Sequence, residues 1–334
     1  MFKKAACFTD IHFGLKNNSR QHNNDCEAFV KWFIDRAKEF GAETCIFLGD
    51  WHHHRSSINI STLNYSISNL KRLSDAFDQT YFLVGNHDLF YRDKREISSV
   101  VFAQEIPKVK VVDEIIVKDD VALIPWLIGN EWKKIQKVKA KYMFGHFELP
   151  NFKMNAMVEM PDHGELNASH FGNVEKVFTG HFHKRQHKGN ISYIGNPFAH
   201  NYADAWDNDR GCMMLEWGQD PKFMIWPDGP KYRTIQLSKL LEAPDDYLEP
   251  ETHVRVKIDI DITYEEANFI KENFQNTYSL REISLLPHKE IEDELEFQGE
   301  IKFQSVDEIV LEQLRNIESE TFDNSVLVEI YNRL

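Results

Sequence analysis

The sequence predicts an α/β fold in which two β-sheets pack together and helices cover their outer faces. Short apolar runs that end in polar loops recur along the 334-residue chain, and such runs are typical of buried strands. Two amphipathic segments separate the first three runs, and strand–helix–strand alternation favours helices packed against a sheet. The second half is richer in expected strands, which fits a second sheet packed on the first.

The individual elements follow from these patterns. Helices are expected at residues 25–40 and 62–77, because apolar side chains such as Phe29, Leu70 and Leu73 recur there at helical spacing. Strands are expected at residues 5–9, 44–48, 80–84, 109–112, 115–117, 121–125, 142–145, 177–179, 191–194, 211–217 and 222–226.

The last quarter of the chain is expected to form separate parts. Residues 241–250 contain two prolines and four acidic side chains, which is typical of a linker, so we expect a first domain over residues 1–240. An alternating strand, a helix N-capped by Thr263 and a second strand predict a small β-α-β domain over residues 241–300. Residues 301–334 are expected to form two amphipathic helices, the first with a capping-box pattern.

The composition predicts a soluble protein. Apolar residues make up 42% of the chain and charged residues 28%, and no apolar run approaches the roughly 20 residues of a membrane helix. The first ten residues lack the apolar core of a signal peptide. The four cysteines include no Cys-x-x-Cys pair, which argues against a disulfide framework or a Cys-based zinc site. We therefore expect a cytoplasmic protein without membrane association.

The net charge is unevenly distributed. The whole chain carries a formal charge of −14, which by itself disfavours a polyanionic partner. However, residues 241–334 hold 8 of the 39 basic and 24 of the 53 acidic side chains, so residues 1–240 keep 31 basic and 29 acidic ones. The first 240 residues can therefore approach a phosphate backbone without global repulsion.

Five polar segments carry the residues that we expect to do chemistry. Each follows an expected strand, and in α/β sheets ligands gather at the carboxyl ends of the strands. The segments are Asp10-Ile11-His12, Gly49-Asp50-Trp51-His52-His53, Gly85-Asn86-His87-Asp88, Gly145-His146 and Gly180-His181-Phe182-His183. Carboxylates, imidazoles and an amide oxygen, with no thiolate, favour hard to borderline divalent metals, and seven such ligands suit a two-metal phosphoesterase.

Each segment has a plainer explanation when it is taken alone. An isolated Asp-x-His is most often a surface loop, Gly-Asn-His-Asp can be a turn whose Asn caps a helix, and Gly-His-x-His can be a structural pair. All five together, in this order and each after an apolar run, favour a metal site over these alternatives.

In this order the segments resemble the motifs of the calcineurin-like metallophosphoesterase superfamily. Its serine/threonine phosphatases carry Asp-Arg-Gly after the second motif and Gly-Asn-His-Glu as the third. Here Gly49-Asp50 continues into Trp51-His52-His53-His54, and the third motif ends in Asp88. The sequence is therefore similar to the nuclease branch, the SbcD-type subunit of the double-strand-break repair nuclease–ATPase complex, and most of all to the recombination endonuclease subunits of tailed bacteriophages. Residues 1–240 carry the strong part of this resemblance.

The resemblance implies the metallophosphoesterase fold and two Mn²⁺ ions, with Mg²⁺ as a possible substitute. It assigns Asp10, His12, Asp50 and His183 to one ion, and Asp50, Asn86, His146 and His181 to the other, with Asp50 as the bridge. It makes His87 the catalytic histidine, and Asp88 beside it is expected to fix the tautomer of the imidazole. His53 matches the second active-site histidine, although the run His52-His53-His54 leaves this register open by one residue.

The resemblance also implies partners. It predicts DNA as substrate, and Arg92, Arg95, Lys184 and Arg185 are candidate phosphate contacts because they follow metal motifs. Residues 241–300 resemble a capping domain over the active site. The helices of residues 301–334 resemble an element that docks on an SMC-like coiled-coil ATPase, and a homodimer through the nuclease domain is typical. The implied role is DNA-end processing in recombination and repair, in the host cytoplasm if the protein is phage-encoded.

Several alternatives remain open at this stage. His187, His200 and the turn Gly195-Asn196-Pro197 either border the substrate cleft or form a structural hairpin. The same metal site can serve a small nucleotide or phosphoprotein substrate, which the missing Asp-Arg-Gly disfavours. A non-catalytic scaffold is disfavoured by the complete ligand set and by His87. The sequence does not predict exonuclease polarity, strand preference, or dependence on the partner and ATP.

Overall fold

The computed structural model describes residues 1–154 and 158–287 of the chain. The two helices expected at residues 301–334, and the end of the β-α-β domain expected at residues 241–300, lie outside the described residues. Within the described part, no helix has the length and apolar character that crossing a membrane requires.

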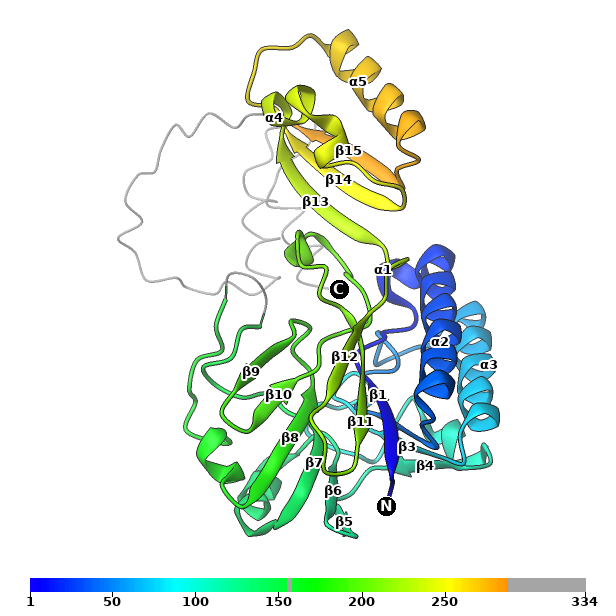
Figure 1. The fold of residues 1–334 in the computed structure, drawn as a ribbon, viewed down its shortest axis with the longest axis vertical. Coiled ribbons are helices and arrows are strands. Elements are labelled where there is room, and N and C mark those ends of the chain that lie inside the picture. Colours follow the sequence, from blue (N-terminus) through cyan, green and yellow to red (C-terminus); the bar gives the residue numbers. More distant parts are fainter. Residues whose placement is uncertain (155–157, 288–334) are drawn as a thin grey trace, which may run out of the picture. The chain divides into compact units, whose positions relative to one another are not determined.

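The first sheet has six strands in the spatial order β12-β11-β1-β2-β3-β4 (Figure 1). Strands β1 to β4 run parallel, and β11 pairs antiparallel with both β1 and β12. The carboxyl ends of the four parallel strands therefore lie along one edge. The bounds are β1 (Lys4–Phe8), β2 (Thr44–Phe47), β3 (Gln79–Leu83), β4 (Val109–Val112), β11 (Gly211–Glu216) and β12 (Lys222–Ile225).

The second sheet also has six strands, in the order β5-β6-β7-β8-β10-β9. The four central strands are parallel, and β5 and β9 are antiparallel edge strands. The bounds are β5 (Ile116–Lys118), β6 (Val121–Ile124), β7 (Ala140–His146), β8 (Val174–Gly180), β9 (Gln186–Lys188) and β10 (Ile191–Tyr193).

The two sheets pack face to face, and helices cover the outer face of the first sheet. Helices α2 (Arg20–Phe40) and α3 (Ile60–Ala76) run side by side (Figure 1). Along β1, Ala6 and Phe8 belong to the core beneath these helices, whereas Cys7 belongs to the core between the sheets. Such alternation is expected of a strand that is buried on both faces. Shorter helices are α1 (Leu15–Asn18) and the 3-10 turns Val101–Glu105, Gly129–Lys137, Ala168–Phe171, Tyr202–Asp204 and Pro244–Asp246.

A third sheet of three parallel strands follows in the chain. Its strands are β13 (Lys231–Gln236), β14 (Thr252–Lys257) and β15 (Glu282–Leu286), connected by α4 (Leu237–Glu242) and α5 (Tyr264–Thr277). Thr263 N-caps α5: its hydroxyl accepts from the Glu266 amide, and the Glu266 carboxylate accepts from the Thr263 amide. An ion pair between Arg281 and Asp25, at 2.6 Å, ties this sheet to α2.

The predicted fold class is confirmed: two mixed sheets pack together, and helices flank them. All the strands expected from the sequence are present, and most begin and end within three residues of the expected positions. Strands β9 and β13 were not predicted. Both are rich in polar residues, so neither stands out as an apolar run.

Candidate metal centre

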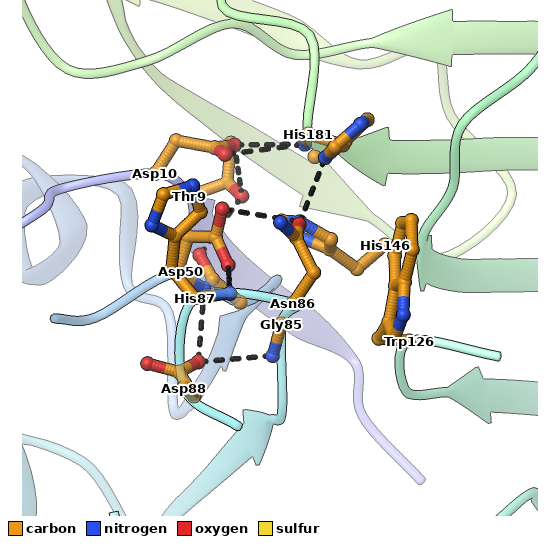
Figure 2. Close-up of polar contacts among 12 residues, drawn as sticks. Thr9, Asp10, Asp50, Gly85, Asn86, His87, Asp88, Trp126, His146 and His181 are labelled. Atoms are coloured by element: carbon orange, nitrogen blue, oxygen red, sulfur yellow. Dashed lines mark hydrogen bonds and ion pairs between the residues drawn. The ribbon is translucent and has the colours of Figure 1, made fainter. Parts of the chain in front are cut away.

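The five polar segments lie at the carboxyl ends of strands from both large sheets. Strands β1, β2 and β3 lead into the segments that contain Asp10, Asp50 and Asn86, while β7 ends at His146 and β8 ends just before His181. Because these strands are parallel within each sheet, their ends converge and bring the segments together (Figure 2).

The backbone at this edge is strained. Asp10, His12, Asp50 and His181 have φ angles of 52°, 51°, 61° and 88°, a left-handed region that costs a non-glycine residue roughly 1–3 kcal/mol. A Cβ atom on Gly85 would lie 2.2 Å from Asp50 Oδ1, so only glycine permits this close approach. Strain of this kind persists where the surrounding structure enforces it, and it is concentrated at functional sites.

The first ligand group consists of Asp10, His12 and His183. Their ligand atoms lie within 4.8 Å of one another. Asp10 Oδ1 is 3.9 Å from both His12 Nε2 and His183 Nε2, and the Thr9 hydroxyl donates to Asp10 Oδ2 at 2.6 Å. Both ring nitrogens of His12 are buried and have no hydrogen-bond partner among the described residues. This group therefore contains potential metal-ligating atoms that lie close together, and the imidazole nitrogens of His12 among them make no hydrogen bond within the described residues.

The second ligand group consists of Asp50, Asn86, His146 and His181. Asn86 Oδ1 lies 3.0 Å from His146 Nε2 and 2.9 Å from His181 Nδ1 (Figure 2). His146 Nδ1 lies 2.7 Å from the Leu48 carbonyl oxygen, which can only accept, so this nitrogen carries a proton. The second group is therefore held together by hydrogen bonds among its own members.

Asp50 lies between the two groups. Its Oδ2 is 3.4 Å from His146 Nε2 and 3.7 Å from His12 Nε2, while its Oδ1 accepts from the His87 amide at 2.8 Å. Burial alone would raise the pKa of Asp50, but His146 and His12 outweigh burial and hold it well below its usual range. Burial raises the pKa of Asp10 to about 7, and the neighbouring Asp50 adds to this shift.

These residues fit a pair of divalent cations. Asp10 and Asp50 are buried carboxylates that repel each other, and positive charge placed between them would offset this repulsion. The His12 imidazole, which has no partner among the described residues, can donate a nitrogen lone pair to a cation. Burial lowers the pKa of His183 to about 4 and that of His12 well below its usual value, and neutral imidazole is the form that binds metal. The Leu48 carbonyl orients the His146 ring, as the outer shell of a metal site typically does.

Two further histidines lie against the first group. The His53 and His87 rings stack with 5.4 Å between centroids, and the His12 ring lies 4.9 Å from His87. His87 Nδ1 is 2.7 Å from the His53 carbonyl oxygen, which leaves Nε2 free. His52 points elsewhere: its two ring nitrogens lie 3.0 and 2.8 Å from the hydroxyls of Ser99 and Ser66. The structure thus brings His53, and not His52, to the site.

Asp88 differs from its expected position. Its carboxylate does not orient the His87 imidazole, because its two oxygens accept from four backbone amides at 2.9 to 3.2 Å. These amides belong to the second and third motifs: Gly85, Asp50, Trp51 and His52. The expected role of Asp88 as the partner of the His87 ring is therefore corrected: the partner of His87 Nδ1 is the His53 carbonyl oxygen. Asp88 instead joins the loops of the second and third motifs through hydrogen bonds to their amides.

The four basic residues expected at the rim are not equivalent. The Arg95 side chain is only 18% exposed and pairs with Glu131, and that of Arg185 is 10% exposed and pairs with Asp209. Both guanidinium groups are thus occupied within the protein, contrary to the expectation that they contact phosphate. Lys184 lies 3.5 Å from Asp207 and is one-third exposed, and the Arg92 side chain is 51% exposed although it pairs with Glu148 at 2.5 Å.

Three residues near the site lie outside the expected ligand set; for His200 the sequence left open whether it borders the substrate cleft, and for the other two it gave no role. His200 is buried with both ring nitrogens unpartnered, and its ring centroid lies 5.1 Å from that of His183, so it borders the site. Glu148 lies 3.7 Å from His181 Nε2 and pairs with Arg92. The Trp126 ring lies 5.1 Å from His181. The sequence could have indicated that Glu148 lies near the site, because it follows the ligand His146 by two residues. No motif next to Trp126 indicates that this residue lies near the site.

Comparison with known proteins gives one family match. Residues 3–185 match the model of the family described as calcineurin-like phosphoesterase, so the match covers more than half of the chain and contains all five motifs. A protein of Enterobacteria phage T4, named exonuclease subunit 1, is 26% identical over 337 residues, which span 97% of this chain and 96% of the phage protein.

Similar solved structures include a phosphoesterase, a nuclease and a dimetal phosphatase. YfcE, a phosphoesterase from E. coli, is 14% identical, with a TM-score of 0.35 over 68% of this chain and 94% of its own. The Pseudomonas putida nuclease MPE is 21% identical, with a TM-score of 0.29, and the match covers 56% of this chain and 66% of the nuclease. A dimetal phosphatase from Danio rerio is 11% identical, with a TM-score of 0.40 over 65% and 93%. The family match therefore rests on sequence and not on these superpositions.

Proposed function

We propose that this chain, which belongs to the calcineurin-like phosphoesterase family, is a two-metal-dependent DNA nuclease. The observation that carries the proposal is the position of Asp50 Oδ2, within 3.7 Å of a histidine from each ligand group. From this position Asp50 would contribute to holding both cations of a site that hydrolyses phosphodiesters. The phage T4 relative, by its name an exonuclease subunit, supports a nucleic-acid substrate.

In this proposal one cation is held by Asp10, His12, Asp50 and His183, and the other by Asp50, Asn86, His146 and His181. Divalent cations supply Lewis acidity, which activates water near neutral pH and offsets charge on the phosphate. The ligands contain oxygen and imidazole nitrogen but no sulfur, which fits Mn²⁺ and also permits Mg²⁺.

His87 is proposed to handle the proton of the leaving oxygen. Its Nδ1 donates to the His53 carbonyl, so its Nε2 is the atom that can hold or release a proton toward the substrate. His53 stacks on His87 and keeps that ring from turning away. Asp88 acts as a positioning residue, because it fixes the loops that carry Asp50 and His87.

Cleavage of DNA by the purified protein tests this function. End-labelled linear duplex and single-stranded DNA are incubated with Mn²⁺, Mg²⁺ or EDTA, beside a para-nitrophenyl phosphodiester. We expect Mn²⁺-dependent degradation of DNA that EDTA abolishes. Turnover of the small ester without DNA cleavage, even with an ATPase partner supplied, would instead support a small-substrate phosphoesterase. Metal binding without either activity would support a scaffold.

The partners are also proposals. The word subunit in the name of the phage T4 relative supports a complex, and we propose an SMC-like coiled-coil ATPase that docks on residues 301–334 for DNA-end processing in recombination and repair. Residues 241–300 are proposed as the capping domain and residues 1–240 as the nuclease domain; strand β13, at the end of the latter range, pairs with β14 in the three-stranded sheet. A homodimer through the nuclease domain, by way of α3, is tested by light scattering of the purified chain.

A further inference from the structure

A cavity of about 220 Å³ opens beside the second ligand group. His146 and Glu148 form its inner end, and Trp126, Trp132 and Met160 contribute to its walls. The Trp126 ring centroid lies 6.0 Å from that of His146 and 5.1 Å from that of His181 (Figure 2). The cavity therefore starts at the proposed metal ligands, but none of the proposed catalytic steps uses it.

The lining of the cavity selects against a phosphate group. No lysine or arginine is among the described residues that line it, whereas two carboxylates, Glu148 and Glu165, are. Two cations lie beside lining residues: Arg92 pairs with Glu148 at 2.5 Å, and the Lys133 ammonium lies 5.5 Å from the centre of the Trp132 ring. Neither residue lines the cavity itself, so a phosphate inside it would have no cation as a direct partner. The tryptophan, methionine and leucine side chains of the walls instead provide the apolar surfaces against which a neutral aromatic ring packs favourably.

The size and shape of the cavity also restrict its ligand. Pockets for drug-sized molecules hold about 300–1,000 Å³, so this smaller cavity suits a single ring system. Trp126 forms a fixed wall: its Nε1 donates to the Arg92 carbonyl at 3.0 Å, and the Arg92 guanidinium lies 5.2 Å from its ring centre. Trp132 lies farther from the ligand groups, in the 3-10 turn Gly129–Lys137, and is partly exposed.

We propose that this cavity is a nucleobase subsite: it takes the base of one nucleotide that flanks the scissile phosphate, and Trp132 is the stacking residue. This inference rests on the proposed function, because it assumes a nucleic-acid substrate at the two ligand groups. A base in the cavity places its own sugar and phosphate toward His146 and His181, where the cations are proposed to bind. The exposed polar groups of His163 and Glu165 lie at the cavity, within reach of the edge of a base.

The first test removes the ring and the base separately. Two single-stranded DNA substrates are used, one with an abasic site on the 5′ side of the scissile bond and one with an abasic site on the 3′ side. The kcat/KM of the wild type and of Trp132→Ala is measured on each of them and on intact DNA. We expect the abasic site at one of the two positions to lower kcat/KM of the wild type about tenfold, within the range that base–aromatic stacking supplies. Trp132→Ala should lower kcat/KM for intact DNA by a similar factor and should no longer discriminate between intact and abasic DNA.

Two further variants separate stacking from a loss of structure. Trp132→Phe keeps an aromatic face and should retain most of the discrimination. Trp206→Ala removes a half-exposed tryptophan from another part of the chain and should leave the discrimination between intact and abasic DNA unchanged. Equal effects of Trp132→Ala on intact and abasic DNA, or a wild type indifferent to both abasic positions, would overturn the subsite.

A second measurement keeps the subsite separable from the proposed function. Inhibition of para-nitrophenyl phosphodiester hydrolysis is compared for dAMP, dTMP and deoxyribose 5-phosphate. We expect both nucleotides to inhibit the wild type about tenfold more strongly than the sugar phosphate, and Trp132→Ala to reduce this ratio to about one. If the protein cleaves no DNA but shows the ratio, the nuclease proposal fails and the base subsite stands. If it cleaves DNA but nucleotides inhibit no more strongly than deoxyribose 5-phosphate, the base subsite fails and the nuclease proposal stands.

Discussion

The two ligand groups contain similar residues but are built differently. In the second group, the Asn86 carbonyl oxygen contacts both histidines and the Leu48 carbonyl fixes the His146 ring. In the first group, His12 has two unpartnered ring nitrogens and lies 3.9 Å from Asp10. The histidines of the second group are therefore preorganised by hydrogen bonds, whereas in the first group such bonds hold Asp10, through the Thr9 hydroxyl and the His181 amide, and not the His12 ring.

The difference indicates how the site is expected to fill. A preorganised group loses little side-chain freedom when an ion binds, but an ion must displace the hydrogen bonds already made there. A group with buried, unsatisfied nitrogens displaces no such bonds, and it relieves a desolvation penalty when it binds an ion. Removing one residue should therefore have different consequences in the two groups, even when both substitutions abolish activity.

Asp50→Asn should have the largest effect, because the Asp50 carboxylate lies between the two groups and is within 3.7 Å of a histidine of each. We expect kcat/KM on DNA to fall on the order of 10⁴-fold, since the loss of one bridging charge weakens both proposed sites at once. Metal content by mass spectrometry should fall for both ions. The matched control is Asp75→Asn on the exposed face of α3, which should change neither quantity. Retention of both ions by Asp50→Asn would contradict the bridging position.

His87→Gln should come next, because His87 belongs to neither group. We expect a decrease in kcat on the order of 10²–10³-fold, which is typical for the loss of a general acid or base. Metal content should remain that of the wild type if His87 is no ligand, although its ligand atom lies within 4.8 Å of those of His12 and His53. Unchanged activity would rule out the catalytic assignment, and lost metal would make His87 part of the first group.

His146→Ala and His12→Ala compare the two groups directly. Without metal, His146→Ala should lower the free energy of unfolding by about 2–3 kcal/mol, because it removes the imidazole from the buried Leu48 carbonyl and leaves the Asn86 oxygen with His181 as its remaining partner. His12→Ala removes a ring that makes no hydrogen bonds through its nitrogens, so the loss should be smaller by about 1 kcal/mol. Urea unfolding in EDTA measures both, and equal losses would show that the groups are equally preorganised.

The sequence predicts the frame of the site well for a physical reason. Asp10, Asp50 and Asn86 each follow an apolar run by one to three residues, and parallel strands bring such positions to one edge. The register at His52 and His53 is not readable in the same way. Which of two adjacent histidines faces the site depends on where Ser66 and Ser99 lie in space, and the chain places these 14 and 47 residues from His52.

The basic residues were harder to predict because ion pairs join distant parts of the chain. Arg95 follows a metal motif, but its partner Glu131 lies 36 residues farther on, so the sequence gives no sign that the guanidinium is occupied. Strand β13 was hidden for another reason. Its Arg233 is buried beside Tyr232, and a buried arginine breaks the apolar pattern from which strands are predicted.

Proton release on metal binding is the smallest expected effect, and it separates the groups by pH. Burial lowers the pKa of His146, but Asp50 more than offsets this and raises it to about 9, so the metal-free ring is a cation at pH 7. An ion at the second group must displace that proton, so its affinity should rise with pH up to about 9. His12 and His183, whose pKa values burial lowers, have no such proton to lose at pH 7, so in the first group only Asp10, whose pKa burial raises to about 7, still holds part of a proton at that pH. Titration calorimetry at pH 7 in buffers of different ionisation enthalpy should therefore find about one more proton released by wild type than by His146→Ala. His12→Ala is the control and should release as many as the wild type; equal release by all three proteins would mean that His146 is neutral before metal binds.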